Sequence, residues 1–566
     1  MLIVLVSWFY IFITLLNFGY LGRLFFKNSF AVNKLIHLVL GLITLMFIGH
    51  IWAFFSGFNA NFHFFLLFVN LLISLIYRKE IIIYIKDILK AVIKIKLKSK
   101  ILLLVIFFLV LAKSASLGSR LDNENYYIQS IQWLNEYGFF KGLGNLHLYF
   151  CQTSGWHVLQ SIFSFDFTDF AFNDLGSFML LLFNIYAIIT YQSKYGSSLL
   201  LTGLPVLNFI LLEFTIVPSP DFGIIMIFLV VVHLFLKNFA QPDSNTFYLI
   251  FLLSLSAMLI KVTGIGLFVF PIILLYKIRN KSLRFWLKLL STSLIFVSIW
   301  IGKNLIISGY PFFPSDYFSE YFNFKHQVPK ELFDFSLRKD MLYEFFATPE
   351  EVNNLSYFEL FWKWLTRSKV SFIFNVSLIL YVLIIPLWII RFKNKPAYWY
   401  IYLSFIGQLI FLAITSPQYR FAIQYLFIFS LMIFIFHIGK KTKFLLFSFS
   451  QLIVLYFILY PLRYDKISST NFHLNPSVFR VQNLIYPAPN SSISSKYEII
   501  NMGNLKYYTP VKNVYFWSNG DCKLPCVNDR QLHYFKHYFN YIPQLIDNDN
   551  LSKGLYSKKL NKKNIK

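Results

Sequence analysis

Residues 116–165 read SLGSRLDNENYYIQSIQWLNEYGFFKGLGNLHLYFCQTSGWHVLQSIFSF, and this stretch divides the chain. It is the first long segment polar enough to leave a lipid bilayer, and apolar runs dominate the sequence on both sides of it. It gathers two carboxylates, Asp122 and Glu124, and two histidines, His147 and His157, into one loop. A loop of this composition between apolar helices is a candidate reaction site held by a membrane scaffold.

The composition of the 566-residue chain is typical of a membrane protein, with 57% hydrophobic residues, 14% charged residues and a mean hydropathy of +0.58. Its apolar runs must form helices, because backbone groups in lipid have to be hydrogen-bonded within their own segment. The sequence therefore predicts an all-α polytopic membrane protein with about fourteen transmembrane helices, within a range of about twelve to fourteen. The first run lacks a basic segment and a small-residue cleavage site, so we interpret it as a retained helix and not a signal peptide.

The apolar runs also suggest how the chain is divided. We expect spans at about 2–20, 35–55, 62–77, 101–115, 175–192, 197–213, 222–237, 246–260, 262–276, 285–302, 370–390, 397–415, 421–438 and 443–460. The expected regions are N-terminal helices (1–115), a loop with the acidic motif (116–174), a helix bundle (175–302), a second loop (303–369), C-terminal helices (370–462) and a small mixed extracytoplasmic domain with a basic tail (463–566).

The charge is strongly basic, with 52 Lys and Arg against 26 Asp and Glu, a net of +26. In a soluble protein this excess would suggest nucleic acid, but here the basic residues lie in short connections, as the positive-inside rule expects, so no nucleic-acid partner is predicted. Residues 80–100 carry a lysine every four residues from Lys86 to Lys98. This pattern predicts an amphipathic basic helix on the cytoplasmic membrane surface, the alternative being an ordinary solvated helix face.

The same count of spans assigns a side to each loop. The basic connections at 277–284, 391–395 and 440–443 fall on the cytoplasmic side. The acidic loop, the second loop, Lys261, the SPQYR segment at 416–420 and the C-terminal region all fall on the opposite side. We therefore expect every motif of chemical interest to face outward.

Asp122 has two interpretations that are compatible with each other. The segment after it has helical spacing and ends at Gly138, so Asp122 could be the N-cap of a helix and Glu124 could complement its dipole. A carboxylate just beyond a membrane helix could also be the general base for an acceptor hydroxyl.

The DNENYY motif (122–127), in an outward loop after a membrane helix, resembles the GT-C superfamily of multi-spanning glycosyltransferases. KVTG (261–264) and SGYPFFP (308–314) also resemble segments of bacterial members, and the resemblance covers roughly 100–320, with a less specific similarity at SPQYR. The whole chain most resembles a bacterial family of multi-spanning proteins without an assigned substrate. The chain departs from the superfamily in two features. In the superfamily the acidic loop usually follows the first span, whereas here four spans are expected before it. The acidic pattern of the superfamily is Asp-x-Asp, whereas here it is Asp-Asn-Glu.

The resemblance implies a transferase of the bacterial inner membrane. It would move a sugar from a polyprenyl-phosphate donor to an extracytoplasmic glycan or a lipid-linked acceptor, with inversion at the anomeric carbon. Asp122 would be the base, and Glu124 a second catalytic carboxylate that orients the acceptor or a cation. The sequence fixes no cofactor, although Mg²⁺ or Mn²⁺ would suit such oxygen ligands. The substrate-binding candidates are Tyr126, Tyr127, His147, His157, Lys261, Lys303 and Arg420.

Each of these candidates also has a simpler interpretation. A leaving phosphate needs positive charge beside it, and Arg420 is the preferred phosphate ligand because guanidinium can bind two phosphate oxygens. Each of the cations could instead be a snorkelling residue at the membrane interface. The histidines could bind phosphate or transfer protons, or only form local hydrogen bonds, and they lack a paired metal-ligand spacing. Trp133 and Trp156 could stack on a sugar, although an anchor at the membrane interface is favoured.

Cys151, Cys522 and Cys526 are too few for a disulfide framework. The last two, four apart in DCKLPC, would pair in an oxidising compartment. Two other functions stay open beside the transferase: a flippase or transporter for a lipid-linked saccharide, and a surface-polysaccharide polymerase. A structural scaffold is a further alternative.

Overall fold

The computed structural model describes residues 1–26, 33–165, 173–192, 199–279, 281–345, 351, 354–393, 396–435, 438–467, 475–511, 518–548 and 550–560. Helices form most of it, so the expected all-α character of the main body is confirmed. Residues 561–566 of the basic tail lie outside the described part.

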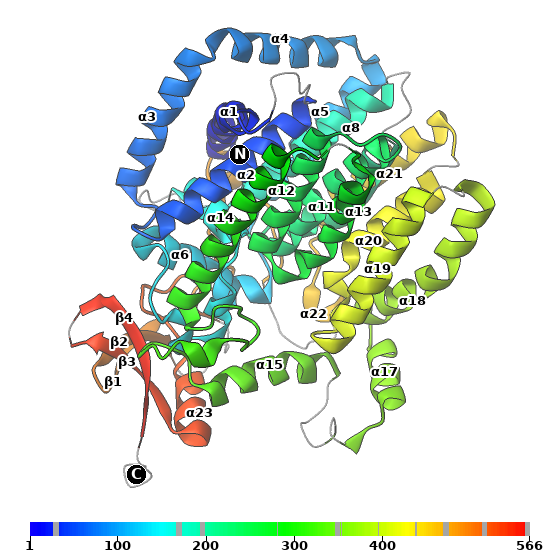
Figure 1. The fold of residues 1–566 in the computed structure, drawn as a ribbon. Helices are drawn as coiled ribbons and strands as arrows, with labels where there is room; N and C mark the ends of the chain where they lie inside the picture. The colour runs from blue at the N-terminus through cyan, green and yellow to red at the C-terminus, as the bar shows by residue number, and fades with distance from the viewer. Residues whose placement is uncertain are drawn as a thin grey trace.

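The first half of the chain is a series of helices, some of which are broken (Figure 1). They are α1 (Leu2–Arg23), α2 (Lys34–Ala53), α3 (Ala60–Ile76), α4 (Arg78–Lys94), α5 (Leu97–Ser114), η1 (Asn123–Tyr127), α6 (Ile128–Tyr137), η2 (Leu143–Asn145), η3 (Leu148–Gln152), α7 (Gly155–Ser164), α8 (Leu175–Gln192), α9 (Leu199–Thr202), η5 (Leu204–Leu207), α10 (Asn208–Thr215), α11 (Pro220–Asn238), α12 (Ser244–Ile260), η6 (Val262–Phe268) and α13 (Val269–Lys277).

The second half continues the bundle and then changes character after α21. Its helices are α14 (Leu283–Ser308), η7 (Ser319–Tyr321), α15 (Lys330–Phe345), α17 (Tyr357–Leu365), α18 (Val370–Trp388), η8 (Ile389–Lys393), α19 (Pro396–Ile414), η9 (Tyr419–Phe421), α20 (Ile423–Ser430), η10 (Leu431–Ile435), α21 (Lys440–Leu459), α22 (Tyr464–Ile467), η11 (Val481–Leu484) and α23 (Asp529–Phe539).

Every expected span falls on one or more helices, but the number of full spans is confirmed only in part. Among the described residues, seven helices are long and apolar enough to cross a membrane: α1, α2, α11, α14, α18 with the start of η8, α19 and α21. An eighth arises if α3 and α4 are counted as one bent span. The other apolar helices are shorter or, like α5, more charged, because breaks such as the one between α9, η5 and α10 divide the apolar runs.

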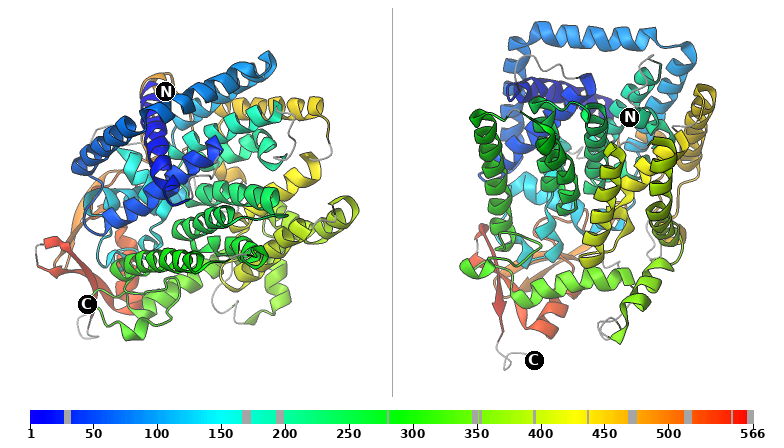
Figure 2. Two further views of the ribbon diagram at one scale, coloured as in Figure 1. Left: turned by 45° about the horizontal axis from the view of Figure 1, so that its top comes forward. Right: turned by 45° about the vertical axis from the view of Figure 1, so that its right-hand side comes forward.

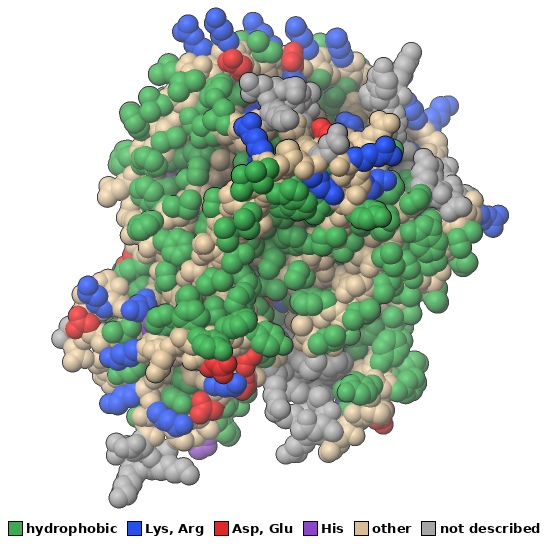
Figure 3. All heavy atoms as spheres, in the orientation of Figure 1, with side chains coloured by type: hydrophobic (Ala, Val, Ile, Leu, Met, Phe, Trp, Pro, Cys, Tyr) green, Lys and Arg blue, Asp and Glu red, His purple; other side chains and the backbone are tan. Residues whose placement is uncertain are grey.

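Helix α4 is the amphipathic helix that the lysine spacing predicts, but it ends at Lys94, and Lys98 lies in α5. It meets α3 at an angle of 85° and lies across one end of the bundle (Figures 1 and 2). Figure 3 shows a row of Lys and Arg side chains along it, above a band of mainly hydrophobic side chains. This arrangement fits a helix that rests on the surface of a bilayer whose core is crossed by the helices below it.

The basic connections gather at this same end of the bundle. Lys34, at the start of α2, forms an ion pair with Asp87 of α4 at 2.8 Å. Lys98, at the start of α5, lies 5.1 Å from the ring centre of Phe444 in α21. These contacts agree with the grouping that the span count gives, in which the basic connections share one side.

The opposite end carries the C-terminal region, and the N-terminus lies against it. The amino group of Met1 donates to the carbonyl of Asn483. The carbonyl of Ala115, just after α5, accepts a 2.9 Å bond from the amide of Ala488. Residues 483–488 of the C-terminal region therefore contact the start of α1 and the end of α5.

The C-terminal region has the mixed structure expected from its composition. β1 (Tyr497–Met502) pairs antiparallel with β2 (Leu505–Pro510), and β3 (Tyr541–Asp547) pairs antiparallel with β4 (Asn550–Lys559). Cys522 and Cys526 form a disulfide, and Cys151 is free and buried, so the expected pairing is confirmed.

The acidic loop is more deeply packed than a polar surface loop would be. Residues 116–165 form η1, α6, η2, η3 and α7, and most of their side chains are buried. α7 packs against α2 and α12, which places it within the bundle. Trp133 and Trp156 are each 1% exposed, so the expectation of interface anchors or sugar-stacking platforms is wrong for both indoles: they fill the core.

Candidate functional site

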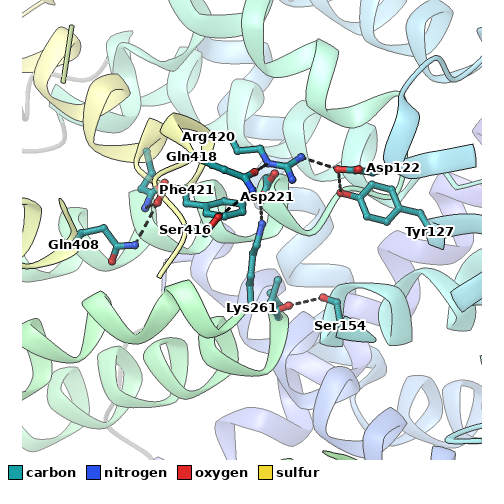
Figure 4. A network of polar contacts seen from close by, with 12 residues as sticks. Asp122, Tyr127, Ser154, Asp221, Lys261, Gln408, Ser416, Gln418, Arg420 and Phe421 are labelled. Carbon is teal, nitrogen blue, oxygen red and sulfur yellow. Dashed lines mark hydrogen bonds and ion pairs between the residues drawn. The ribbon is translucent and has the colours of Figure 1, made fainter. Parts of the chain in front are cut away.

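Four ionisable side chains from four distant parts of the chain meet in the helix bundle (Figure 4). Two are carboxylates and two are cations, and they form two ion pairs: Asp122 with Arg420, and Asp221 with Lys261. We call these four residues the charged cluster.

Asp122 precedes η1, a short π-helical segment, and its carboxylate makes no capping hydrogen bond to the backbone. Instead, Oδ2 accepts a 2.6 Å hydrogen bond from Nη1 of Arg420 and a 3.4 Å bond from the hydroxyl of Tyr127. The capping interpretation of this side chain is therefore wrong, because the carboxylate is used in a long-range contact. Gly138, by contrast, does end α6, with a φ of 73° and an amide bonded to the carbonyl of Leu134.

Arg420 lies in η9, in the loop that joins α19 to α20. Its Nε donates to Oε1 of Gln418 at 2.6 Å, and its guanidinium carbon lies 5.1 Å from the ring centre of Phe421. Burial opposes the charged form, but the nearby carboxylates of Asp122 and Asp221 outweigh it and hold the pKa of Arg420 well above its ordinary value. About a third of its side chain, 35%, remains accessible to solvent, so a ligand could reach the guanidinium.

Asp221 and Lys261 form the second and more enclosed pair. Asp221 lies in the first turn of α11, and Lys261 ends α12 at the start of the KVTG motif. Their Oδ1 and Nζ atoms are 2.5 Å apart, and the side chains are 7% and 23% exposed. The Nζ of Lys261 also lies 3.7 Å from the ring centre of Phe421, so this ring contacts both cations of the cluster.

Two of the expected substrate-binding residues, Tyr127 and His157, lie behind Asp122. The ring of His157 in α7 is 5.1 Å from that of Tyr127, and Tyr126 contacts both rings. His157 is fully buried, and neither of its nitrogens has a hydrogen-bond partner among the described residues. Burial lowers the pKa of His157 to about 3, so the imidazole is neutral and is not a phosphate-binding cation at neutral pH.

Lys303 and His147 lie outside the cluster. The Nζ of Lys303 in α14 donates to the carbonyl of Thr153 at 2.8 Å, and the lysine is buried at 6% exposure. The Nδ1 of His147 accepts from the amide of Tyr149 at 3.0 Å, which is the local hydrogen bond that a loop histidine commonly makes. The two side chains therefore hold the loop 147–153 in place.

Glu124 points toward the C-terminal region and has no contact with the cluster. It is fully buried, and it accepts hydrogen bonds from the Ser491 hydroxyl at 2.5 Å and from the Ser492 amide and hydroxyl at 2.7 and 2.9 Å. Burial, the largest cause, raises the pKa of Glu124 to about 7 against these bonds, and the nearby Asp521 contributes in the same direction. Its expected role in orienting a substrate or a cation stays a prediction without a supporting contact.

The C-terminal region is bonded along the whole segment that carries Asp122. The side-chain Nδ2 of Asn123 donates to the carbonyl of Asn490 at 2.9 Å. Six residues further on, Nε2 of Gln129 donates to the carbonyls of Asn519 and Cys522 at 2.8 and 2.9 Å, which fixes the disulfide loop on α6. The position of Asp122 thus depends on residues near the end of the chain.

The donor set does not fit a shared metal site. Asp122 is occupied by Arg420 and Glu124 by Ser491 and Ser492, so the two carboxylates of the motif do not converge. Among the described residues, no three His, Cys, Asp or Glu side chains lie close enough together to hold a metal ion. The chemistry assigned to these residues therefore uses no metal ion.

The site residues expected from the sequence do not include Asp221. The signal was available, because PSPD puts a carboxylate at the outer end of a span, as KVTG does for Lys261. Phe421 and Gln418 were missed, although both flank Arg420 in PQYRF. Only the packing of α11, α12 and α20 reveals that these residues are neighbours.

The fold and the cluster define a helical protein of the membrane-spanning type with a charged site at one end. The chain belongs to the family described as a domain of unknown function, DUF8201, whose model matches residues 1–427. The match includes all four residues of the charged cluster and ends before α21 and the C-terminal region. No curated protein and no solved structure matches the chain.

Proposed function

We propose that the protein is a GT-C-type membrane glycosyltransferase that moves a sugar from a polyprenyl-phosphate-linked donor to an extracytoplasmic glycan or lipid-linked acceptor. The observation that carries the proposal is the contact between Asp122 and Arg420. It joins a candidate base, which follows α5, to a candidate phosphate ligand in the loop between the apolar helices α19 and α20. We place the protein in the bacterial inner membrane.

The reaction assigned to the cluster is a single displacement. An acceptor oxygen attacks the anomeric carbon, the bond from that carbon to the donor phosphate breaks, and the phosphate oxygen keeps the electron pair. Asp122 accepts the proton of the attacking hydroxyl, a contribution of about 10²- to 10⁴-fold for a well-placed base. Arg420 and Lys261 offset the charge that develops on the phosphate. Attack opposite the leaving group inverts the configuration of the anomeric carbon.

The ion pairs of the free protein suggest how the donor is admitted. Each cation of the cluster already has a carboxylate partner, so neither cation presents an unpaired charge to the apolar bundle. A donor phosphate would compete with Asp122 for Arg420, which presents several donors in a plane and can bind two oxygens at once. Asp122 would then be released from its cation as the phosphate binds, while Tyr127 still bonds its Oδ2.

A transporter or flippase for a lipid-linked saccharide is the second candidate. The broken run α9, η5 and α10 favours it, because transporters bind their substrates at discontinuous helices. So does the buried ion pair between Lys113 of α5 and Glu213 of α10, which are 2.9 Å apart and lie within apolar helices. A surface-polysaccharide polymerase is the third candidate, and it would use the same lipid carriers.

The test is a mass-spectrometric profile of lipid-linked and surface glycans. The strains are a deletion, and the deletion restored with wild type, with Asp122→Asn or with Asp316→Asn, at matched protein levels. Asp316 is the control, because it forms an exposed pair with Lys330 away from the cluster. We expect the deletion and Asp122→Asn to lose the same sugar and Asp316→Asn to restore it.

The other outcomes separate the alternatives. Full restoration by Asp122→Asn would overturn the catalytic assignment. A complete lipid-linked unit that accumulates at the cytoplasmic face would indicate the transporter. Single complete repeat units that are not joined would indicate the polymerase.

A further inference from the structure

The nine-residue helix α17 exposes an unusual number of large apolar side chains. Tyr357 is 93% exposed, Phe358 72% and Trp362 55%. The helix itself is well formed, since Ser356 and Glu359 make a reciprocal capping box at its start. A stable helix that leaves aromatic rings uncovered indicates an interaction surface and not a loosely packed connection.

The uncovered face of α17 continues into a surface that faces lipid. Helix α18 follows directly and is one of the seven candidate spans. Its side chains Phe372 and Ile373 are 45% and 62% exposed, and their exposure is explained by hydrocarbon around the span. In Figure 1, α17 lies against the lower end of α18, at the end of the bundle away from α4.

The composition of α17 matches the boundary between water and hydrocarbon. Tyr and Trp concentrate at membrane interfaces because their rings are amphipathic. Glu359 and Lys363 supply a charged side to the same short helix. Charged and aromatic side chains on one short helix suit a helix that lies in the interface.

Two hydrogen bonds hold α17, one to the loop that carries Arg420 and one to α18. The indole of Trp364 donates to the carbonyl of Pro417 at 2.6 Å, three residues before Arg420. The side-chain Nδ2 of Asn375 in α18 donates to the carbonyl of Trp364 at 2.7 Å. The position of α17 therefore constrains the loop that carries Arg420.

We propose that α17 docks in the headgroup region of the lipid leaflet at this end of the bundle and holds the Arg420 loop at that depth. The occupant of the exposed aromatic face is phospholipid. The proposal requires that the chain spans a membrane, and it does not depend on the reaction proposed above.

Site-directed spin labelling tests whether α17 lies in the headgroup region, because the native cysteines should react little with the label. Cys151 is buried, and Cys522 and Cys526 are joined in a disulfide. Phe358→Cys and Trp362→Cys would each carry a nitroxide in vesicles of phosphatidylcholine and phosphatidylglycerol. Lys363→Cys is the matched control on the charged side of the same helix, outside the capping box, and the unsubstituted protein gives the labelling background.

Collision rates with oxygen, which concentrates in hydrocarbon, and with a water-soluble nickel chelate are the readout. We expect several-fold more oxygen collisions relative to nickel at 358 and 362 than at 363. In the Trp364→Phe background we expect the label at 358 to become more mobile, because the bond to Pro417 is lost.

Two results would overturn the proposal. Equal nickel accessibility at all three labels would show that the aromatic face lies in water. Protection of positions 358 and 362 from both reagents would show that protein covers the face, either a second copy of the chain or another partner. A label at 363 that reports a folded, lipid-reconstituted protein excludes misfolding as the cause.

Discussion

Asp122 and Arg420 are 298 residues apart in the chain, yet the guanidinium donates a 2.6 Å hydrogen bond to the carboxylate. The contact joins the loop after α5 to the loop before α20. It also explains why neither residue is a simple helix cap or a simple snorkelling cation. Each satisfies the charge of the other at a place where both remain partly accessible to solvent.

Arg420→Lys should separate charge from geometry at this contact. Lysine keeps the positive charge but cannot present two parallel donors to a phosphate. We expect the KM for the lipid-linked donor to rise about tenfold, the equivalent of about 1.4 kcal/mol, with a smaller change in kcat. Arg530→Lys, at an exposed position of α23, is the control and should change neither KM nor kcat. A fall in kcat alone would contradict phosphate binding by Arg420.

The enclosed pair predicts a stability effect that a second substitution reverses. Lys261→Met leaves the carboxylate of Asp221 buried and without its lysine partner. The free energy of unfolding should fall by about 3 kcal/mol, which is near the low end for a broken buried pair because Arg420 lies near the carboxylate. Asp221→Asn combined with Lys261→Met should recover most of the unfolding free energy but no transfer activity. Thermal unfolding in detergent measures the first and a transfer assay the second. Equal stability of the single and double variants would contradict the pairing.

Glu124 predicts a pH dependence of the docking between the C-terminal region and the bundle. Burial raises its pKa from 4.5 to about 7, so between these values the folded protein keeps a proton that the unfolded chain has lost. Stability should therefore fall as the pH rises through this window, and the full penalty is present above it. Burial also raises the pKa of Asp521 to about 6, which adds a fall of the same sign at lower pH.

Glu124→Gln isolates the contribution of this carboxyl, because glutamine does not titrate. Limited proteolysis gives a midpoint for cleavage of the C-terminal region at each pH. The wild-type midpoint should differ between about pH 5 and about pH 8, and this difference should be smaller in Glu124→Gln. Glu498→Gln, on an exposed position of β1, should leave the difference unchanged. An unchanged slope in Glu124→Gln would show that other groups control it.

The disulfide predicts a labelling pattern and a local stability cost. Without reductant, the native protein should react with no cysteine-specific reagent, and the denatured protein should react only at Cys151. Replacing Cys522 and Cys526 with Ser should cost about 2 kcal/mol, estimated from closure of a short loop. The cost should appear as faster proteolysis near residues 518–526, because this loop is also fixed by Gln129. Labelling of three cysteines in the denatured, unreduced protein would contradict the pairing.

The sequence predicted the parts of this structure that depend on local pattern. The apolar runs are helical, the lysine period of α4 is an amphipathic helix, and Gly138 ends α6, because each is set by neighbouring residues. Counting spans also put Asp122, Lys261 and Arg420 at one end of the molecule. It could not place them within that end: Lys303 shares the end but contacts Thr153 and not the cluster.

Two other features were not predicted. The break between α9, η5 and α10 falls at Gly203 and Pro205, which are a local signal, but the apolar run was expected to be one span. Glu124 lies two residues from Asp122 and faces Ser491 instead of the cluster, because side chains two residues apart on a helix point to different sides. The contact of Glu124 with Ser491 joins distant segments and has no local sequence signal.

The bond between Glu124 and Ser491 also concerns the order in which the protein is made. The two residues are 367 positions apart, and at a synthesis rate of about 5–20 residues per second the serine follows the glutamate by about 20–70 s. During that interval Asp122 already exists, but the segments that bond its neighbours have not yet emerged from the ribosome. Nascent chains, and chains truncated before residue 475, should therefore contain all four members of the charged cluster without the contacts that fix the Asp122 segment.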